Sequence, residues 1–151
     1  MWFERHAWVV LLASTLLYVP QLWRRARPHI TAHPELEPGY RRLIWGIVLW
    51  LCLPWLVMGV GDLVVGIPSF LRYFRPAGGE PFIWVFWVVA FVWTAVTGYW
   101  GIRGGGAEVL VRYPGLLDFR TDSVRRVKWY FAGLAVFGFA INTAVLVVAN
   151  R

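Results

Sequence analysis

The chain has 151 residues, of which 59% are hydrophobic and only 15% are charged. An average soluble domain is about half apolar and a quarter charged, so this composition excludes an ordinary soluble fold and indicates a membrane protein. The net charge is +7. Because the basic residues stand at the ends of apolar stretches, where they orient a protein in a bilayer, we expect no nucleic-acid partner.

Four apolar stretches follow one another along the chain, at about residues 7–23, 43–65, 82–102 and 129–149. Each is long enough to cross a hydrocarbon core of about 30 Å as a helix, and none contains Lys or Arg before its ends. The sequence therefore predicts an all-α polytopic membrane protein. We expect one domain, residues 1–151, with four transmembrane helices in an antiparallel bundle.

The first connection, residues 24–42, contains Pro28, Pro34 and Pro38 and is predicted to be irregular. His29 and His33 have the four-residue spacing of metal ligands on a helix, and Glu35 follows them. The flanking prolines disfavour a regular helix there, so we expect no metal site.

The two later connections are also rich in helix breakers. Residues 66–81 mix aromatic and basic side chains, which is typical of a short piece lying in the membrane interface. The third connection opens with three glycines at 104–106, turns at Pro114-Gly115, and ends with a predicted helix N-cap at residues 121–123.

Lys and Arg are distributed unequally between the connections. The first connection holds five and the third holds six of the 15 in the chain, whereas the second holds only Arg72 and Arg75. The positive-inside rule therefore predicts both termini on the non-cytoplasmic side, and we expect the membrane to be a bacterial inner membrane. Tryptophans mark the inner end of each stretch, as expected for an aromatic belt: Trp23, Trp45, Trp100 and Trp129.

Small residues that let helix backbones approach closely mark the expected contact faces. The candidates for helix packing are Gly59, Ala90, Gly98, Ala135 and Gly138. Large aromatic residues such as Trp50 and Trp93 are expected mostly elsewhere, toward lipid or a partner subunit.

Asp62 is an ionisable group inside an apolar stretch, which makes it a functional candidate. It lies near the outer edge, where it could instead pair with Arg72 or Arg75 or meet water. Asn142, Thr94 and Thr97 are the other polar candidates, and we hypothesise that all four converge in a polar patch that binds a proton or a cation. For Asn142 the simpler interpretation is a hydrogen bond between helices.

The basic residues near the inner ends are candidates for contact with anionic lipid. They are Arg24, Arg25, Arg27, Arg41, Arg42, Arg125, Arg126 and Lys128.

No catalytic residue is expected, because no Ser, His and Asp set or carboxylate pair gathers near either interface. No cofactor is expected either: Cys52 is the single cysteine, and no histidine lies within a stretch to bind haem. The first hypothesis is a non-catalytic subunit or scaffold that assembles with other membrane proteins or as a homo-oligomer. The alternative is a small oligomeric ion channel or ion-coupled transporter that uses Asp62 and Asn142.

Overall fold

The computed structural model describes residues 2–76, 80–117 and 122–149, and every regular element in these ranges is helical. Four helices are long and apolar enough to cross a membrane: His6–Ala32, Pro34–Val65, Pro81–Ile102 and Val124–Val148. The four stretches predicted from the sequence fall almost wholly within these spans. The prediction of an all-helical chain with four helices able to span a membrane is confirmed.

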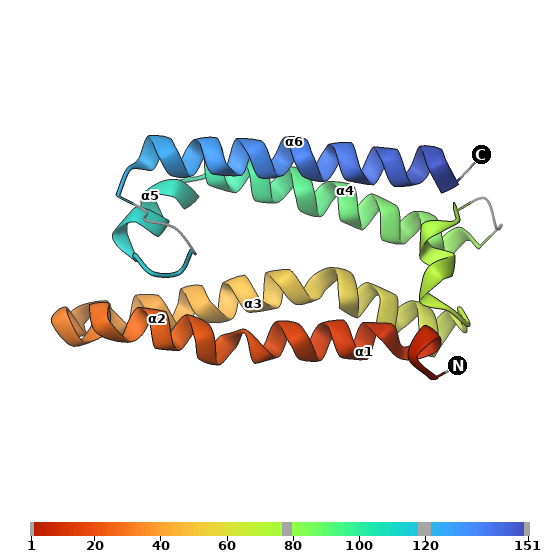
Figure 1. The fold of residues 1–151 in the computed structure, drawn as a ribbon, viewed down its shortest axis with the longest axis horizontal. Coiled ribbons are helices and arrows are strands. Elements are labelled where there is room, and N and C mark those ends of the chain that lie inside the picture. Colours follow the sequence, from red (N-terminus) through yellow and green to blue (C-terminus); the bar gives the residue numbers. More distant parts are fainter. Residues whose placement is uncertain (1, 77–79, 118–121, 150–151) are drawn as a thin grey trace.

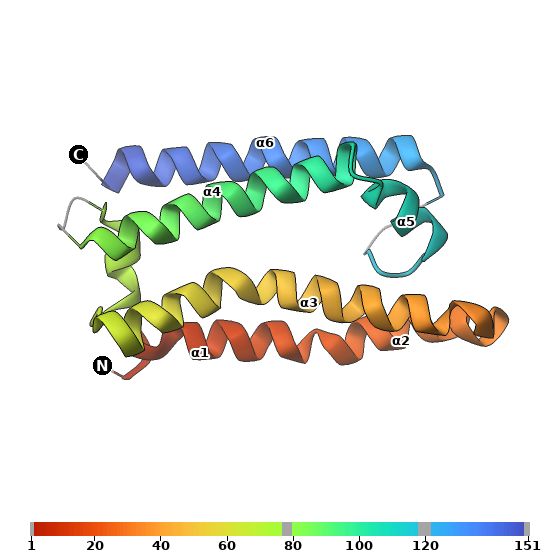
Figure 2. The same ribbon diagram turned by 180° about the vertical axis from the view of Figure 1, so that it is seen from behind.

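The long helices lie side by side in two pairs (Figures 1 and 2). In the first pair, α1 (Trp2–Leu17) and α2 (Val19–Ala32) follow one another as a single long span, which packs along α3 (Glu37–Val60). In the second pair, α4 (Pro81–Ile102) packs along α6 (Val124–Ala149). Both ends of the described chain lie at one end of the molecule, which we call the terminal end.

The proline-rich first connection is mostly helical, so the prediction of an irregular segment was wrong. Pro20 and Pro38 stand in the first turns of α2 and α3, and Pro34 begins a short 3₁₀ turn, η1 (Pro34–Leu36). Proline is compatible with these positions because the first backbone N–H groups of a helix have no partner within it. Only Pro28 stands inside α2. The helix therefore continues well beyond the apolar stretch.

The two remaining connections also fold. A π-helical turn, η2 (Gly61–Val65), continues α3 and ends at Gly66, whose φ of 77° favours glycine. A 3₁₀ segment, η3 (Phe70–Phe74), lies across the terminal end, where the sequence indicated a short interfacial piece. The third connection contains an unpredicted short helix, α5 (Gly106–Arg112), at the opposite end, which we call the α5 end.

Two separate groups of buried side chains hold the ends of the molecule together. At the α5 end, Tyr40 and Ile44 of α3 belong to the same cluster as Leu110 of α5 and Val127 of α6. Tyr40 also donates a hydrogen bond of 2.8 Å to the Pro114 carbonyl. At the terminal end the cluster contains Met58, Ile67, Tyr73, Ile83, Phe86 and Trp87. The connections thus pack against the helices and join the two pairs at both ends.

Large apolar side chains remain exposed along the outer faces of both pairs. Leu49 of α3 is 63% exposed and Phe137 of α6 is 64% exposed. Such faces are compatible with lipid tails, which solvate apolar side chains without any cost. Most residues of α6 are exposed, so the other helices cover only a small part of its surface.

Candidate functional site

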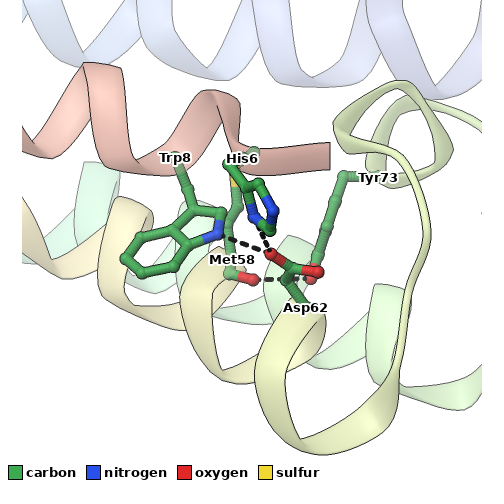
Figure 3. A network of polar contacts seen from close by, with 5 residues as sticks. All are labelled: His6, Trp8, Met58, Asp62 and Tyr73. Atoms are coloured by element: carbon green, nitrogen blue, oxygen red, sulfur yellow. Dashed lines mark hydrogen bonds and ion pairs between the residues drawn. The ribbon is translucent and has the colours of Figure 1, made fainter. Parts of the chain in front are cut away.

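Among the described residues, the most buried acidic side chain lies where α3 passes into the π turn. Asp62 is 4% exposed, and its Oδ2 atom accepts a hydrogen bond of 2.9 Å from the Trp8 indole Nε1. The same oxygen lies 2.9 Å from His6 Nδ1, so two side chains of α1 converge on it (Figure 3). A buried carboxylate is costly unless it is hydrogen-bonded, and α1 supplies that compensation.

Local backbone features bring these partners together. His6 has non-helical angles, φ −108° and ψ 25°, at a kink in α1. On the α3 side, Gly59 leaves room for the Trp8 ring, since a Cβ atom there would lie 3.0 Å from the indole. The π turn places Asp62 on the face toward α1, and such single wide turns are frequent at functional sites. Gly59 is therefore a packing residue, although its neighbour is an aromatic ring and not a second small residue.

Tyr73 closes the site from η3. Its hydroxyl donates a hydrogen bond of 3.0 Å to the Met58 carbonyl, and a Cβ atom at Gly61 would overlap the phenol ring (Figure 3). The indole Nε1 of Trp87 in turn donates to the Tyr73 carbonyl at 2.8 Å. Burial, and then the neighbouring charge of Asp62, raise the pKa of Tyr73 to about 12. The phenol is therefore a neutral hydrogen-bond donor at physiological pH.

The arrangement brings a carboxylate, an imidazole and a phenol to the terminal end of the molecule. Arg72 and Arg75, which the sequence offered as ion-pair partners of Asp62, are exposed, and the contacts seen among the described residues join Asp62 to α1. The contacts at this site are hydrogen bonds from or to the carboxylate and the phenol, and they join α1, α3 and η3. Within the described ranges, no three His, Cys, Asp or Glu side chains are grouped as metal ligands.

The other predicted polar residues lie in different contacts. Asn142 Nδ2 of α6 lies 3.4 Å from Thr94 Oγ1 of α4, a long hydrogen bond inside the second pair. Gly138 adjoins it, since a Cβ atom there would lie 2.8 Å from the Thr94 methyl group. Thr97 accepts a hydrogen bond of 2.8 Å from the Trp50 indole. The structure brings Thr94 and Asn142 together, and divides the four candidates among three contacts.

Trp50 of α3 and Trp93 of α4 join the two pairs through ring stacking and a hydrogen bond. Their rings stack with centroids 6.3 Å apart and planes 16° apart. Pro54 has no N–H group and cannot bond to the Trp50 carbonyl one turn earlier in α3. The Trp93 indole of α4 donates to that carbonyl at 2.9 Å. Both tryptophans, expected mostly toward lipid or a partner, are instead half-buried against each other.

Small residues of α4 allow α6 to approach closely. A Cβ atom at Gly98 would lie 2.8 Å from the Ala135 methyl group, and one at Gly101 would overlap the Phe131 ring. Ala90, the remaining packing candidate, is half-buried, and its carbonyl accepts the Thr94 hydroxyl at 2.9 Å. Gly98 and Ala135, two of the predicted packing residues, lie at this contact, and Gly101 is its tightest position.

The predicted lipid-contact residues lie toward the α5 end of the molecule, and most are exposed. Arg24, Arg27 and Arg42 are exposed, and Arg25 donates a hydrogen bond of 3.0 Å to the Tyr18 hydroxyl. The remaining residues of this set form ion pairs with nearby carboxylates, except Arg125: Arg41 with Glu37, Arg126 with Asp122 and Lys128 with Glu108. His33 lies 3.4 Å from Glu35, and both are exposed.

The sequence did not predict His6, Trp8 or Tyr73 as partners of the acid. A usable signal existed for the first two, because a hairpin of two spans returns residue 62 to the level of the first residues of α1. Tyr73 carried no comparable signal, since its place depends on how η3 folds back. Comparisons with protein-family models, with curated proteins and with solved structures find no significant match to this chain.

Proposed function

We propose that this chain is a small non-catalytic integral membrane protein that acts as a subunit or scaffold, either beside other membrane proteins or in a homo-oligomer. The observation that carries the proposal is the division of polar and apolar groups. Asp62, Thr94 and Asn142 are engaged in contacts inside the fold, whereas large apolar side chains line the outer faces. Such a surface is suited to lipid and to other helices.

We further propose that the spans form an antiparallel bundle in a bacterial inner membrane, with both termini on the non-cytoplasmic side. The unequal distribution of Lys and Arg supports this orientation, because the first and third connections hold eleven of the 15. In the cell, the α5 end would then face the cytoplasm.

Gentle extraction from native membranes tests assembly directly. Native mass spectrometry should find the chain with stoichiometric partners or in several copies, and a clean monomer would contradict the proposal. Two substitutions of equally exposed residues locate the contact face. A partner on the second pair is lost in Phe137→Ala and retained in Leu49→Ala, while a partner on the first pair gives the reverse.

A second candidate function is an ion channel or ion-coupled transporter in which Asp62 exchanges a proton. The 2.9 Å contact between its carboxylate and His6 favours this candidate, since buried ionisable groups in spans frequently mark ion pathways. Asn142 lies in a different contact and is not part of that proposal. In liposomes, Asp62→Asn should abolish flux and Thr97→Val should retain it; equal flux in wild type and Asp62→Asn would remove the acid from the mechanism.

A further inference from the structure

A groove of about 560 Å³ lies between the end of α4 and the beginning of α6, at the α5 end. It is lined by Ile102, Val124, Arg125, Lys128, Trp129 and Ala132. Its volume is within the range of pockets that hold small molecules. Most of these side chains are apolar, but two carry positive charge. The groove therefore matches both parts of an amphipathic anion, because its apolar wall suits an apolar body and its two cations suit a negative head.

The charges of the groove do not cancel. Lys128 Nζ lies 2.7 Å from Glu108 Oε1, and this hydrogen bond lowers the pKa of Glu108 below its ordinary value, so that the carboxylate stays ionised near neutral pH. Arg125 is exposed and makes no ion pair within the described ranges, while its neighbour Arg126 is paired with Asp122 at 2.6 Å. Among the described residues, the guanidinium of Arg125 has no acidic partner, and the ammonium of Lys128 beside it has further donors.

We propose that this groove binds one anionic phospholipid, with its phosphate at Arg125 and Lys128 and an acyl chain along Ile102 and Ala132. The inference rests on the proposed placement of the α5 end at the cytoplasmic surface. Basic pockets between transmembrane helices at this surface suit anionic headgroups, and the arginine fork matches phosphate oxygens.

Two further observations favour a lipid over free phosphate. Trp129 lines the groove and is 69% exposed, which is the position of an aromatic side chain at the headgroup level of a bilayer. The apolar wall continues from α4 to α6 through Ile102 and Ala132, and it would gain nothing from a small hydrated anion.

The test uses the full chain in nanodiscs of phosphatidylcholine with increasing phosphatidylglycerol, and native mass spectrometry counts the retained lipids. Arg125→Gln should weaken retention of phosphatidylglycerol about tenfold, the effect of losing charge-assisted hydrogen bonds to the phosphate in addition to the attraction of one positive charge. Arg126→Gln is the matched control, because it removes the same charge one residue away and outside the groove. Ala132→Trp fills the groove without changing any charge and should also reduce retention. Circular dichroism verifies that each variant is folded.

The result expected is loss in Arg125→Gln and Ala132→Trp, retention in Arg126→Gln, and no competition by excess inorganic phosphate. Equal losses in the two arginine variants would overturn the proposal, since they indicate diffuse attraction to a charged surface. Competition by inorganic phosphate would show a phosphate site instead of a lipid site. Equal retention of phosphatidylcholine and phosphatidylglycerol would exclude recognition of the headgroup charge.

Discussion

Trp93→Phe removes the donor that satisfies the Trp50 carbonyl, and its cost depends on Pro54. The indole Nε1 lies 2.9 Å from that carbonyl oxygen, which α3 cannot bond internally because residue 54 is proline. A polar group left without a partner costs about 1–3 kcal/mol, and little water is present inside a bilayer to replace the donor. We expect Trp93→Phe to destabilise the protein by about this amount.

Pro54→Ala isolates the hydrogen bond from the rest of the contact. Alanine restores an N–H group to residue 54, which can then bond to the Trp50 carbonyl within α3. In the Pro54→Ala background, Trp93→Phe should change stability only through the weaker stacking of phenylalanine on Trp50. That change in stacking energy is the same with proline or alanine at residue 54, so it cancels in the double-mutant cycle. The coupling energy between Pro54 and Trp93 should therefore be about 1 kcal/mol or more.

Equilibrium unfolding in mixed micelles of mild detergent and dodecyl sulfate, followed by circular dichroism, measures these free energies. Trp84→Phe is the control, because Trp84 is 50% exposed on the same helix, and it should change stability by no more than about 0.5 kcal/mol. If Trp93→Phe costs the same with proline as with alanine at residue 54, the indole does not compensate for the proline, and the account of how the two pairs are joined is refuted.

Three further predictions concern the helix contact and the two titrating side chains. Gly101→Ala should cost about 1–3 kcal/mol in the same unfolding assay, because its methyl group would overlap a ring of α6, whereas Gly133→Ala meets nothing within 4 Å and should gain up to about 1 kcal/mol. The pKa of Tyr73 is about 12 in the folded protein against 10.0 ordinarily, so its contribution to stability is complete below pH 10 and is lost as the pH rises toward 12. Tyr73→Phe should lack this loss, and an identical pH profile would contradict the burial of the phenol. The pKa of Glu108 is lowered by Lys128, so the stability from this pair is present above the ordinary carboxylate pKa of 4.5 and is lost as the pH falls below it. Lys128→Met should raise the Glu108 pKa in an NMR titration, and an unchanged value would exclude the pairing.

The spans could be predicted from the sequence because bilayer thickness fixes the length of an apolar helix, and hydropathy reports it directly. The small-residue faces of α4 and α6 could also be recognised, since Gly98 belongs to one such stripe and Ala135 and Gly138 to another, but the sequence did not indicate that these two faces meet. How far each helix extends beyond its apolar stretch could not be predicted from the sequence. Pro34 and Pro38 predict an interruption of the helix when read from the sequence, but a proline in the first turn of a helix is favourable, and only the structure places those turns.

The partners of the polar groups could be predicted least. The Asp62 contacts depend on a kink at His6 and a π turn, neither of which has a reliable sequence signature. Trp50 and Trp93 were assigned to the outside because aromatic residues favour lipid and interfaces. The carbonyl freed by Pro54 creates a demand for a donor from α4, and that demand becomes visible only when the two pairs are side by side.

Cysteine accessibility tests the proposed membrane placement most directly. In a Cys52→Ala background, Ser69→Cys lies in the second connection and Thr31→Cys lies at the end of α2. A membrane-impermeant maleimide added to intact spheroplasts should label Ser69→Cys at once and Thr31→Cys only after permeabilisation. Labelling of both residues from the same side would contradict the membrane-spanning first pair and the orientation derived from the basic residues.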